Sequence, residues 1–288
     1  MILTERVILH ACLHHCPVQE RTSLFKYLAP PERQLLENLP KTYGQPLRHP
    51  GTPEETLRLI HYSWISPFLR MLAEKEIGFF LSSLSHPQAL SVGKDLLFAG
   101  KLPSLTPLGK QFLQGKLLGY LTAEIEDLLP LTALPESPLN VLLDLKNDTL
   151  NLSLDFLGLH DLAIEVRQII EKHKLNKIYE ALTPPQLNYL KILMQSPEPV
   201  AFSRMGLSTW NEDKEKLKIL IRQRGGNRLA KALYGQDPSF TWYVLHKLEV
   251  ERALLVKKLY APMENNRATQ ILIDQILEFI TYTRQHHE

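Results

Sequence analysis

The sequence has few of the features that define exported, membrane-spanning or strongly charged proteins. Its 288 residues include two cysteines and 13 glycines, and the formal net charge is +2. Two cysteines cannot form a disulfide framework, so we expect a reducing compartment such as the cytoplasm. A charge this small means that any polyanion would have to bind at a local patch. No uninterrupted apolar run approaches the roughly 18–20 residues of a membrane span, and the first 16 residues lack a signal-peptide cleavage pattern.

The motifs of common catalytic sites are also missing. The sequence contains no G-x-S-x-G, no H-E-x-x-H, no Walker glycine loop and no G-x-G-x-x-G. His160, Asp161 and Glu165 occur together, but such charges are typical of the first turn of a helix. We therefore expect a protein that is not an enzyme and that carries no cofactor.

What the sequence does have is an ordered series of helix signals. Apolar residues make up 44% of the chain, and many of the 20 prolines stand at the start of apolar-periodic segments. Thr52, Pro53 and Glu55 form a capping-box pattern, in which Thr52 is the N-cap. The double prolines Pro30-Pro31 and Pro184-Pro185 open further helices. The predicted fold class is mainly α.

Residues 141–156, VLLDLKNDTLNLSLDF, depart from this helical period. Apolar and polar side chains alternate on both sides of Asn147-Asp148. This pattern predicts a β-hairpin with a short Asn/Asp turn and one buried face. An isolated hairpin is only marginally stable, so it should lie on helices or be extended by a partner strand. The predicted domains are an N-terminal helical module of residues 1–137, a hairpin linker of residues 138–157 and a C-terminal helical module of residues 158–288.

The two halves of the chain repeat similar signals in the same order. Thr183-Pro184-Pro185 echoes Ala29-Pro30-Pro31, and Asp237-Pro238 falls near the position of Ser85-His86-Pro87 in the first half. The repetition predicts an internal duplication. Chance similarity between two helical, proline-started halves is the alternative.

The clearest helix signals lie in residues 236–262. Asp237 suits an N-cap, Pro238 suits the first helical position, and Phe240, Val244 and Leu248 recur every fourth residue. The spacing from Pro238 through Tyr243-Val244-Leu245 and Lys247-Leu248-Glu249 to Glu251-Arg252-Ala253 resembles a motif segment of the flagellar switch protein FliG. A second stretch, residues 158–193, is similar to later FliG helices.

The resemblance implies two armadillo-like modules that serve as a scaffold in a bacterial flagellar or type III secretion base. The nearest role would be that of an SctK-like linker in the cytoplasmic sorting platform, at the inner-membrane face. In the family, His-Pro-Gln opens a helix that packs against neighbouring repeats and partner rings. The corresponding partner-binding residues here would be His86, Pro87 and Gln88, and the altered triplet Asp237, Pro238 and Ser239.

A basic run provides an alternative function. Its seven cations, with Glu215 as the single acid among them, are Lys214, Lys216, Lys218, Arg222, Arg224, Arg228 and Lys231. The Gly225-Gly226 pair within the run predicts a turn at a helix end, where exposed N–H groups could hold a phosphate. The run therefore predicts a surface for nucleic acid or for an acidic protein. The other interpretation is a solvated helix face, and few aromatic residues interrupt the run for base stacking.

Two further segments leave alternatives open. Cys12 and Cys16 at i, i+4 could bind zinc together with His15, but the sequence offers no second pair of cysteines, so they are interpreted as small apolar residues. We expect no metal. Residues 265–288 carry an apolar helical stripe that either packs onto its own module or docks in a groove of a partner.

Overall fold

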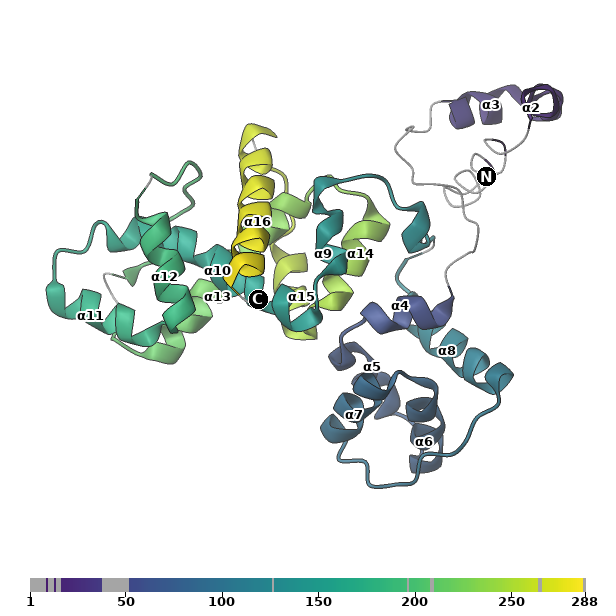
Figure 1. Cartoon of the computed structure of the whole chain (residues 1–288), viewed down its shortest axis with the longest axis horizontal. Coiled ribbons are helices and arrows are strands. Elements are labelled where there is room, and N and C mark those ends of the chain that lie inside the picture. The colour runs from purple at the N-terminus through teal and green to yellow at the C-terminus, as the bar shows by residue number, and fades with distance from the viewer. Residues whose placement is uncertain are drawn as a thin grey trace. The chain divides into compact units, whose positions relative to one another are not determined.

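The computed structural model describes residues 9, 13, 17–37, 52–125, 127–195, 197–207, 210–263 and 266–286. Across these ranges the protein is mainly helical, as Figure 1 shows, and it contains no β-strand. The predicted helical class is therefore confirmed. No helix within the described ranges combines the length and the apolar character that crossing a membrane requires.

The chain divides into two compact units. Unit 1 consists of Met1–Leu143 and Asp237–Glu249, and unit 2 consists of Asp144–Gln236 and Val250–Glu288. The chain thus passes between the units three times. The first crossing falls within the predicted linker of residues 138–157. The two later crossings were not anticipated, because they move one helix of the second half into unit 1.

Unit 1 is built around short helices that begin at prolines or capping residues. Its α-helices are α2 (Val18–Phe25), α3 (Pro30–Glu37), α4 (Pro53–Leu59), α5 (Tyr62–Leu69), α6 (Glu74–Ser83), α7 (His86–Asp95), α8 (Pro107–Leu121), α9 (Val141–Asp144, which ends at the first crossing) and α14 (Pro238–Lys247). Two 3-10 turns, η1 (Leu131–Ala133) and η2 (Pro138–Asn140), precede α9. The core of the unit is formed by side chains that include Leu57, Ile60, Ile65, Leu69, Leu81, Val92 and Leu117.

The predicted start of α4 is confirmed. Thr52 Oγ1 accepts a hydrogen bond from the Glu55 amide at 3.3 Å, and the Thr52 amide donates to Glu55 Oε2 at 3.1 Å. These two bonds satisfy amide groups that the first helical turn leaves free. The helix is short, because the backbone leaves the helical region at Ile60 and α5 starts after His61.

Unit 2 is organised around two long helices, α10 (Asn147–Val166) and α13 (Lys214–Leu233), which pack against each other. The surrounding helices are α11 (Lys172–Ala181), α12 (Pro184–Leu193), α15 (Val250–Leu259) and α16 (Asn266–His286). Figure 1 shows α16 alongside α10 and α13, and all three pairs of these helices are in contact. Leu272, Ile276 and Phe279 of α16 are buried, so the terminal stripe packs onto its own unit.

Glycines bring α10 and α13 close together where they cross. A Cβ atom at Gly225 of α13 would lie 1.6 Å from the carbonyl oxygen of Leu154, and one at Gly158 of α10 would lie 1.9 Å from that of Ile221. Both distances are far below van der Waals contact, so only glycine fits at either position. Gly225 and Gly226 therefore lie buried inside α13, and the predicted turn at this pair is wrong.

The predicted β-hairpin is not observed, since residues 141–156 fall within α9 and α10. Asn147-Asp148, interpreted as the turn, instead begins α10, where a first-turn acid is favourable. Of the alternating polar residues, Asp144 and Lys146 are exposed, whereas Asn151 and Ser153 are buried. Ser153 Oγ donates to the Leu150 carbonyl at 2.6 Å, and Asn151 Nδ2 donates to the Asn147 carbonyl at 2.9 Å. A helix buried on most sides can hide such residues because its own backbone satisfies them.

Candidate functional site

The seven cations of the basic run all lie on α13, but they do not form one surface. Lys214, Lys216 and Lys218, in the first turns of the helix, are exposed. Lys218 Nζ lies 2.7 Å from Glu215 Oε1, and Lys214 Nζ donates to the Glu180 carbonyl at 3.4 Å. This end of the run is more exposed to a partner than the rest, where Arg222, Arg224 and Lys231 are half-buried and Arg228 is buried.

The middle of the run is engaged within unit 2. Arg222 pairs with Asp155, with 3.2 Å between Nε and Oδ1. Arg224 donates to Ser203 Oγ at 3.2 Å and also to the Arg204 carbonyl. Lys231, at the far end of the helix, donates to the Ala261 carbonyl at 3.1 Å. These cations therefore hold α10 and two loops of unit 2 against α13.

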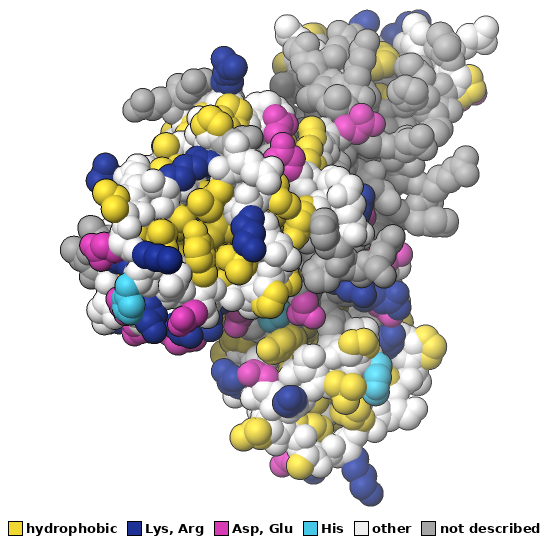
Figure 2. All heavy atoms as spheres, turned by 60° about the vertical axis from the view of Figure 1, so that its left-hand side comes forward, with side chains coloured by type: hydrophobic (Ala, Val, Ile, Leu, Met, Phe, Trp, Pro, Cys, Tyr) yellow, Lys and Arg dark blue, Asp and Glu magenta, His cyan; other side chains and the backbone are white. Residues whose placement is uncertain are grey.

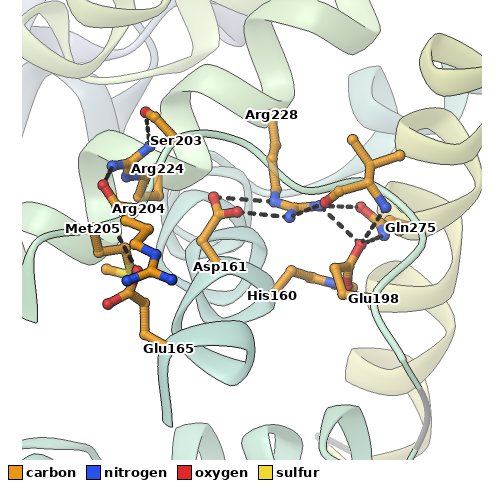
Figure 3. Close-up of polar contacts among 11 residues, drawn as sticks. His160, Asp161, Glu165, Glu198, Ser203, Arg204, Met205, Arg224, Arg228 and Gln275 are labelled. Carbon is orange, nitrogen blue, oxygen red and sulfur yellow. Dashed lines mark hydrogen bonds and ion pairs between the residues drawn. The ribbon is translucent and has the colours of Figure 1, made fainter. Parts of the chain in front are cut away.

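Arg228 is the centre of a buried polar cluster, and none of its surface is exposed. Figure 3 shows its guanidinium facing Asp161 on one side, and Glu198 and Gln275 on the other. Its nitrogens donate to Asp161 Oδ1 at 2.8 Å, Glu198 Oε1 at 3.2 Å, Gln275 Oε1 at 2.7 Å and the Val200 carbonyl at 2.9 Å. The planar guanidinium carries several N–H donors in fixed directions, so it suits a site where several oxygen acceptors converge. Because the group is buried, no partner can reach it.

Glu198 links the connection between α12 and α13 to the helices of unit 2. Its carboxylate lies 2.7 Å from His160 Nδ1 of α10, and it accepts from Gln275 Nε2 of α16. Further along the same connection, the Met205 amide donates to Glu165 Oε1 at 2.9 Å. Buried charges therefore replace regular secondary structure in fixing residues 197–207.

The electrostatics of the cluster favour an ionised Glu198. Burial by itself would raise its pKa, but the hydrogen bond from His160 and the charge of Arg228 together outweigh burial and hold the pKa at about 2. The net pKa shift is opposite at the neighbouring phenol, where burial is not outweighed. Burial raises the pKa of Tyr189, and the negative charges of Glu278 and Glu198 raise it further.

Acid should destabilise unit 2 through Glu198. The pKa of this carboxyl is depressed from 4.5 to about 2 in the folded state. Its contribution to the free energy of unfolding is therefore complete above pH 4.5 and is lost as the pH falls toward 2. The shift corresponds to about 3 kcal/mol of unfolding free energy. Urea unfolding of the protein between pH 7 and pH 2.5 should show this loss.

The E198Q variant separates this contribution from general acid effects. It should have a flatter acid limb than the wild type over the same pH range. E54Q is the matched control, because Glu54 is nearer the surface and its pKa is lowered by hydrogen bonds from Lys110 and then Arg58. Equal acid sensitivity of the wild type and E198Q would contradict the assignment.

The His86-Pro87-Gln88 motif is used inside unit 1. It opens α7 after the N-cap Ser85, whose hydroxyl lies 2.9 Å from Gln88 Oε1. Gln88 Nε2 donates to the carbonyls of Leu57 at 2.5 Å and Ile60 at 2.9 Å. The motif thus satisfies carbonyl groups at the end of α4.

The altered triplet Asp237-Pro238-Ser239 is also internal to unit 1. Asp237 is the N-cap that the sequence predicts, and its Oδ1 accepts from the amides of Ser239 at 2.8 Å and Phe240 at 3.2 Å. Ser239 is buried and its hydroxyl accepts from the Leu129 amide at 3.0 Å. Both motif helices, α7 and α14, consequently belong to the same unit.

The zinc candidates Cys12, His15 and Cys16 lie outside the described residues. Among the residues that the structure does describe, no group of three or more His, Cys, Asp and Glu side chains is placed to hold a metal ion.

An apolar helix face of unit 1, which the sequence patterns did not single out, is the best candidate for partner binding. On α8, Leu108 is 76% exposed and Phe112 is 61% exposed. Gly115 and Gly119 continue the same face, and a Cβ at either would meet nothing within 4 Å. Lys116 borders this face, with its ammonium 5.6 Å from the centre of the Phe112 ring. We refer to Leu108, Phe112, Gly115 and Gly119 as the α8 face.

The other side of α8 is packed into unit 1. Leu117 is fully buried, and Gln114 Nε2 donates to the Ser83 carbonyl at 2.8 Å. A surface helix normally directs polar residues toward water, whereas α8 directs two large apolar side chains there. Large apolar groups gathered on a surface mark sites of association.

Unit 2 also carries exposed apolar side chains. Figure 2 shows hydrophobic groups gathered on one face of the molecule, with lysine and arginine side chains among and around them. Ile170, Ile192 and Ile219 are among the exposed large hydrophobic residues of this unit. They come from different segments, whereas the α8 face is one regular helix surface.

Comparison of the chain with protein-family models, with curated proteins and with solved structures found no match.

Proposed function

We propose that this protein is a non-enzymatic scaffold or adaptor that binds partner proteins through exposed helix faces. The observation that carries the proposal is the α8 face, on which Leu108 and Phe112 are exposed beside two glycines. The glycines let a partner backbone approach closely, and the two large side chains supply apolar area to bury. Lys116 at its border favours a partner helix that carries acidic residues.

The resemblance to FliG suggests which assembly contains these partners. The His-Pro-Gln motif that opens α7 and the altered triplet that opens α14 both lie in unit 1, which presents the α8 face, whereas residues 158–193, the second stretch similar to FliG, lie in unit 2. The proposed setting is the cytoplasmic side of a bacterial type III secretion or flagellar base, where an SctK-like linker would join other components.

Nucleic-acid binding by the basic run has less support. Of its seven cations, Arg228 is buried, and Arg222, Arg224 and Lys231 are bonded to groups of unit 2. Neutralising several phosphates requires several accessible cations in one place. Lys214, Lys216 and Lys218 are the cations that such a function would use.

Replacing Phe112 with aspartate should weaken partner capture at least about tenfold. The change places a charge in the centre of the α8 face, where a bound partner would have to desolvate it. The measurement is affinity capture from a bacterial lysate with wild-type and F112D protein, in which secretion or flagellar base components are quantified by mass spectrometry.

I170D is the matched control, because Ile170 is 97% exposed and lies in unit 2. It makes the same kind of change away from α8 and should leave capture intact. Thermal unfolding of both variants should match the wild type, since neither side chain is buried. The proposal would be abandoned if the wild type recovered no such component, or if F112D and I170D behaved alike.

A further inference from the structure

Helix α14 packs within unit 1, and hydrogen bonds to other segments of the unit fix both of its ends. Its N-terminal half is fixed to the segment before η1. Ser239 Oγ accepts from the Leu129 amide at 3.0 Å, and the Tyr243 hydroxyl donates to the Leu129 carbonyl at 3.0 Å. Tyr243 is fully buried and also hydrogen-bonds with the side chain of Thr56, and burial raises its pKa to about 12. Its phenol is therefore a neutral donor in this contact.

The C-terminal end of α14 is fixed by the start of α5. The His61 amide donates to the His246 carbonyl at 2.8 Å, and Trp64 Nε1 donates to the Leu248 carbonyl at 3.0 Å. The Trp64 and His246 rings are also in contact, tilted by 31° with centroids 4.2 Å apart. Carbonyls at the end of a helix have no partner within it, so these donors recognise a helix terminus.

Between the two ends, α14 buries an apolar face and one cation. Phe240 and Val244 are buried, and Leu248 continues the same side. Lys247 is also buried, and its Nζ donates to the Leu143 carbonyl at 2.8 Å. The groove thus selects an N-capped helix with serine, tyrosine and lysine at fixed positions. Leu143, Leu129 and the start of α5 are all more than 90 residues from α14 in the chain.

We infer that residues 52–143 form a binding groove for an α14-type helix and that a second copy of this chain can supply that helix. All of these contacts are non-covalent, so the groove cannot distinguish its own α14 from that of another copy. A second copy is the occupant whose side chains match each polar contact. In the chain, α14 lies between two crossings. The chain passes from unit 2 into unit 1 after Gln236 and returns to unit 2 after Glu249.

The protein concentration determines whether the groove holds α14 of its own chain or α14 of a second copy. In one copy, α14 competes at an effective concentration of the order of millimolar or above. Exchange between copies should therefore appear when chains are crowded together or are refolded together. This inference does not depend on the partner proposed for the α8 face.

A peptide of residues 236–250 tests the groove. The full-length S239A/Y243F variant loses the four hydrogen bonds that these two side chains make with Leu129, Asp127 and Thr56, so its groove should be more open. Fluorescein-labelled wild-type peptide should bind this variant at least about tenfold more tightly than it binds the wild-type protein, by fluorescence anisotropy. Peptide that carries the same two substitutions should bind at least about tenfold more weakly.

Circular dichroism of the variant gives the control for folding, and S239A alone is the milder variant to use if the double variant loses helix content. Weak binding by a helical variant, equal to that of the wild type, would overturn the inference.

Exchange between copies is tested with full-length chains that carry two different affinity tags. The F112D substitution is included in both chains to remove association through the α8 face. Refolding the mixture from urea at high concentration should give doubly tagged dimers that persist on dilution. Recovery of monomers only, at every concentration up to about 1 mM, would rule out the second copy as the source of the helix.

Discussion

A single methyl group at Gly225 should destabilise unit 2 by more than about 3 kcal/mol. The added Cβ would lie 1.6 Å from the carbonyl oxygen of Leu154, so α10 and α13 would have to separate. Overpacking in a core commonly costs about 1–3 kcal/mol, and a clash with backbone has fewer ways to relax. Urea unfolding of G225A, followed by circular dichroism, measures the loss.

G115A and G119A are matched controls for this substitution. Each also adds a methyl group inside a helix, but neither Cβ would meet another atom within 4 Å. These variants should gain about 0.5–1 kcal/mol, because alanine restricts the unfolded chain more than glycine does. A G225A protein as stable as G115A would show that α10 and α13 do not cross as described.

Removing the guanidinium in R228M should lower the free energy of unfolding by about 3–5 kcal/mol. The substitution keeps most of the side-chain volume but leaves Asp161 and Glu198 as buried charges without their cation. R228K should recover only part of the loss, because an ammonium cannot reproduce the two bonds to Asp161. Thermal and urea unfolding of the three proteins at pH 7 provide the comparison.

R222M is the control for the same chemical change on the same helix. Arg222 is partly exposed and pairs with Asp155 alone, so its loss should cost no more than about 1 kcal/mol. Similar losses for R228M and R222M would contradict the central position of Arg228 in the cluster.

The helix starts could be predicted because their signals are local. Thr52 and Glu55 close a capping box within four residues, and Asp237 caps α14 through amides two and three positions away. Such bonds require no knowledge of the rest of the fold. The helical class followed from many signals of this kind.

The incorrect predictions of a β-hairpin and of a glycine turn concern residues whose environment is set by distant segments. The alternation around Asn147-Asp148 is typical of a strand in isolation, yet it belongs to a helix buried by α12, α13 and α16. Gly225-Gly226 is typical of a helix end, yet the partner that requires glycine is Leu154, about 70 residues earlier. The periodicity of a sequence does not show which helices pack against each other.

The surroundings of the candidate site residues were predicted least well, for a related reason. Arg228 and Lys218 belong to the same basic run, but Arg228 is buried among carboxylates and Lys218 is exposed. His160 and Asp161 lie in the interior of α10, and not in a first turn. The α8 face carried no signal, because apolar residues occur all around that helix.

The position of α14 in the sequence means that unit 1 is completed late during translation. Residues 52–143 leave the ribosome first, but the helix that completes their unit is encoded about 100 residues later. At about 5–20 residues per second, synthesis of the intervening chain takes roughly 5–20 s. During that time unit 2 is being made while the groove of unit 1 is unfilled. A nascent chain would then be a ready acceptor for α14 from a copy made just ahead of it on the same message.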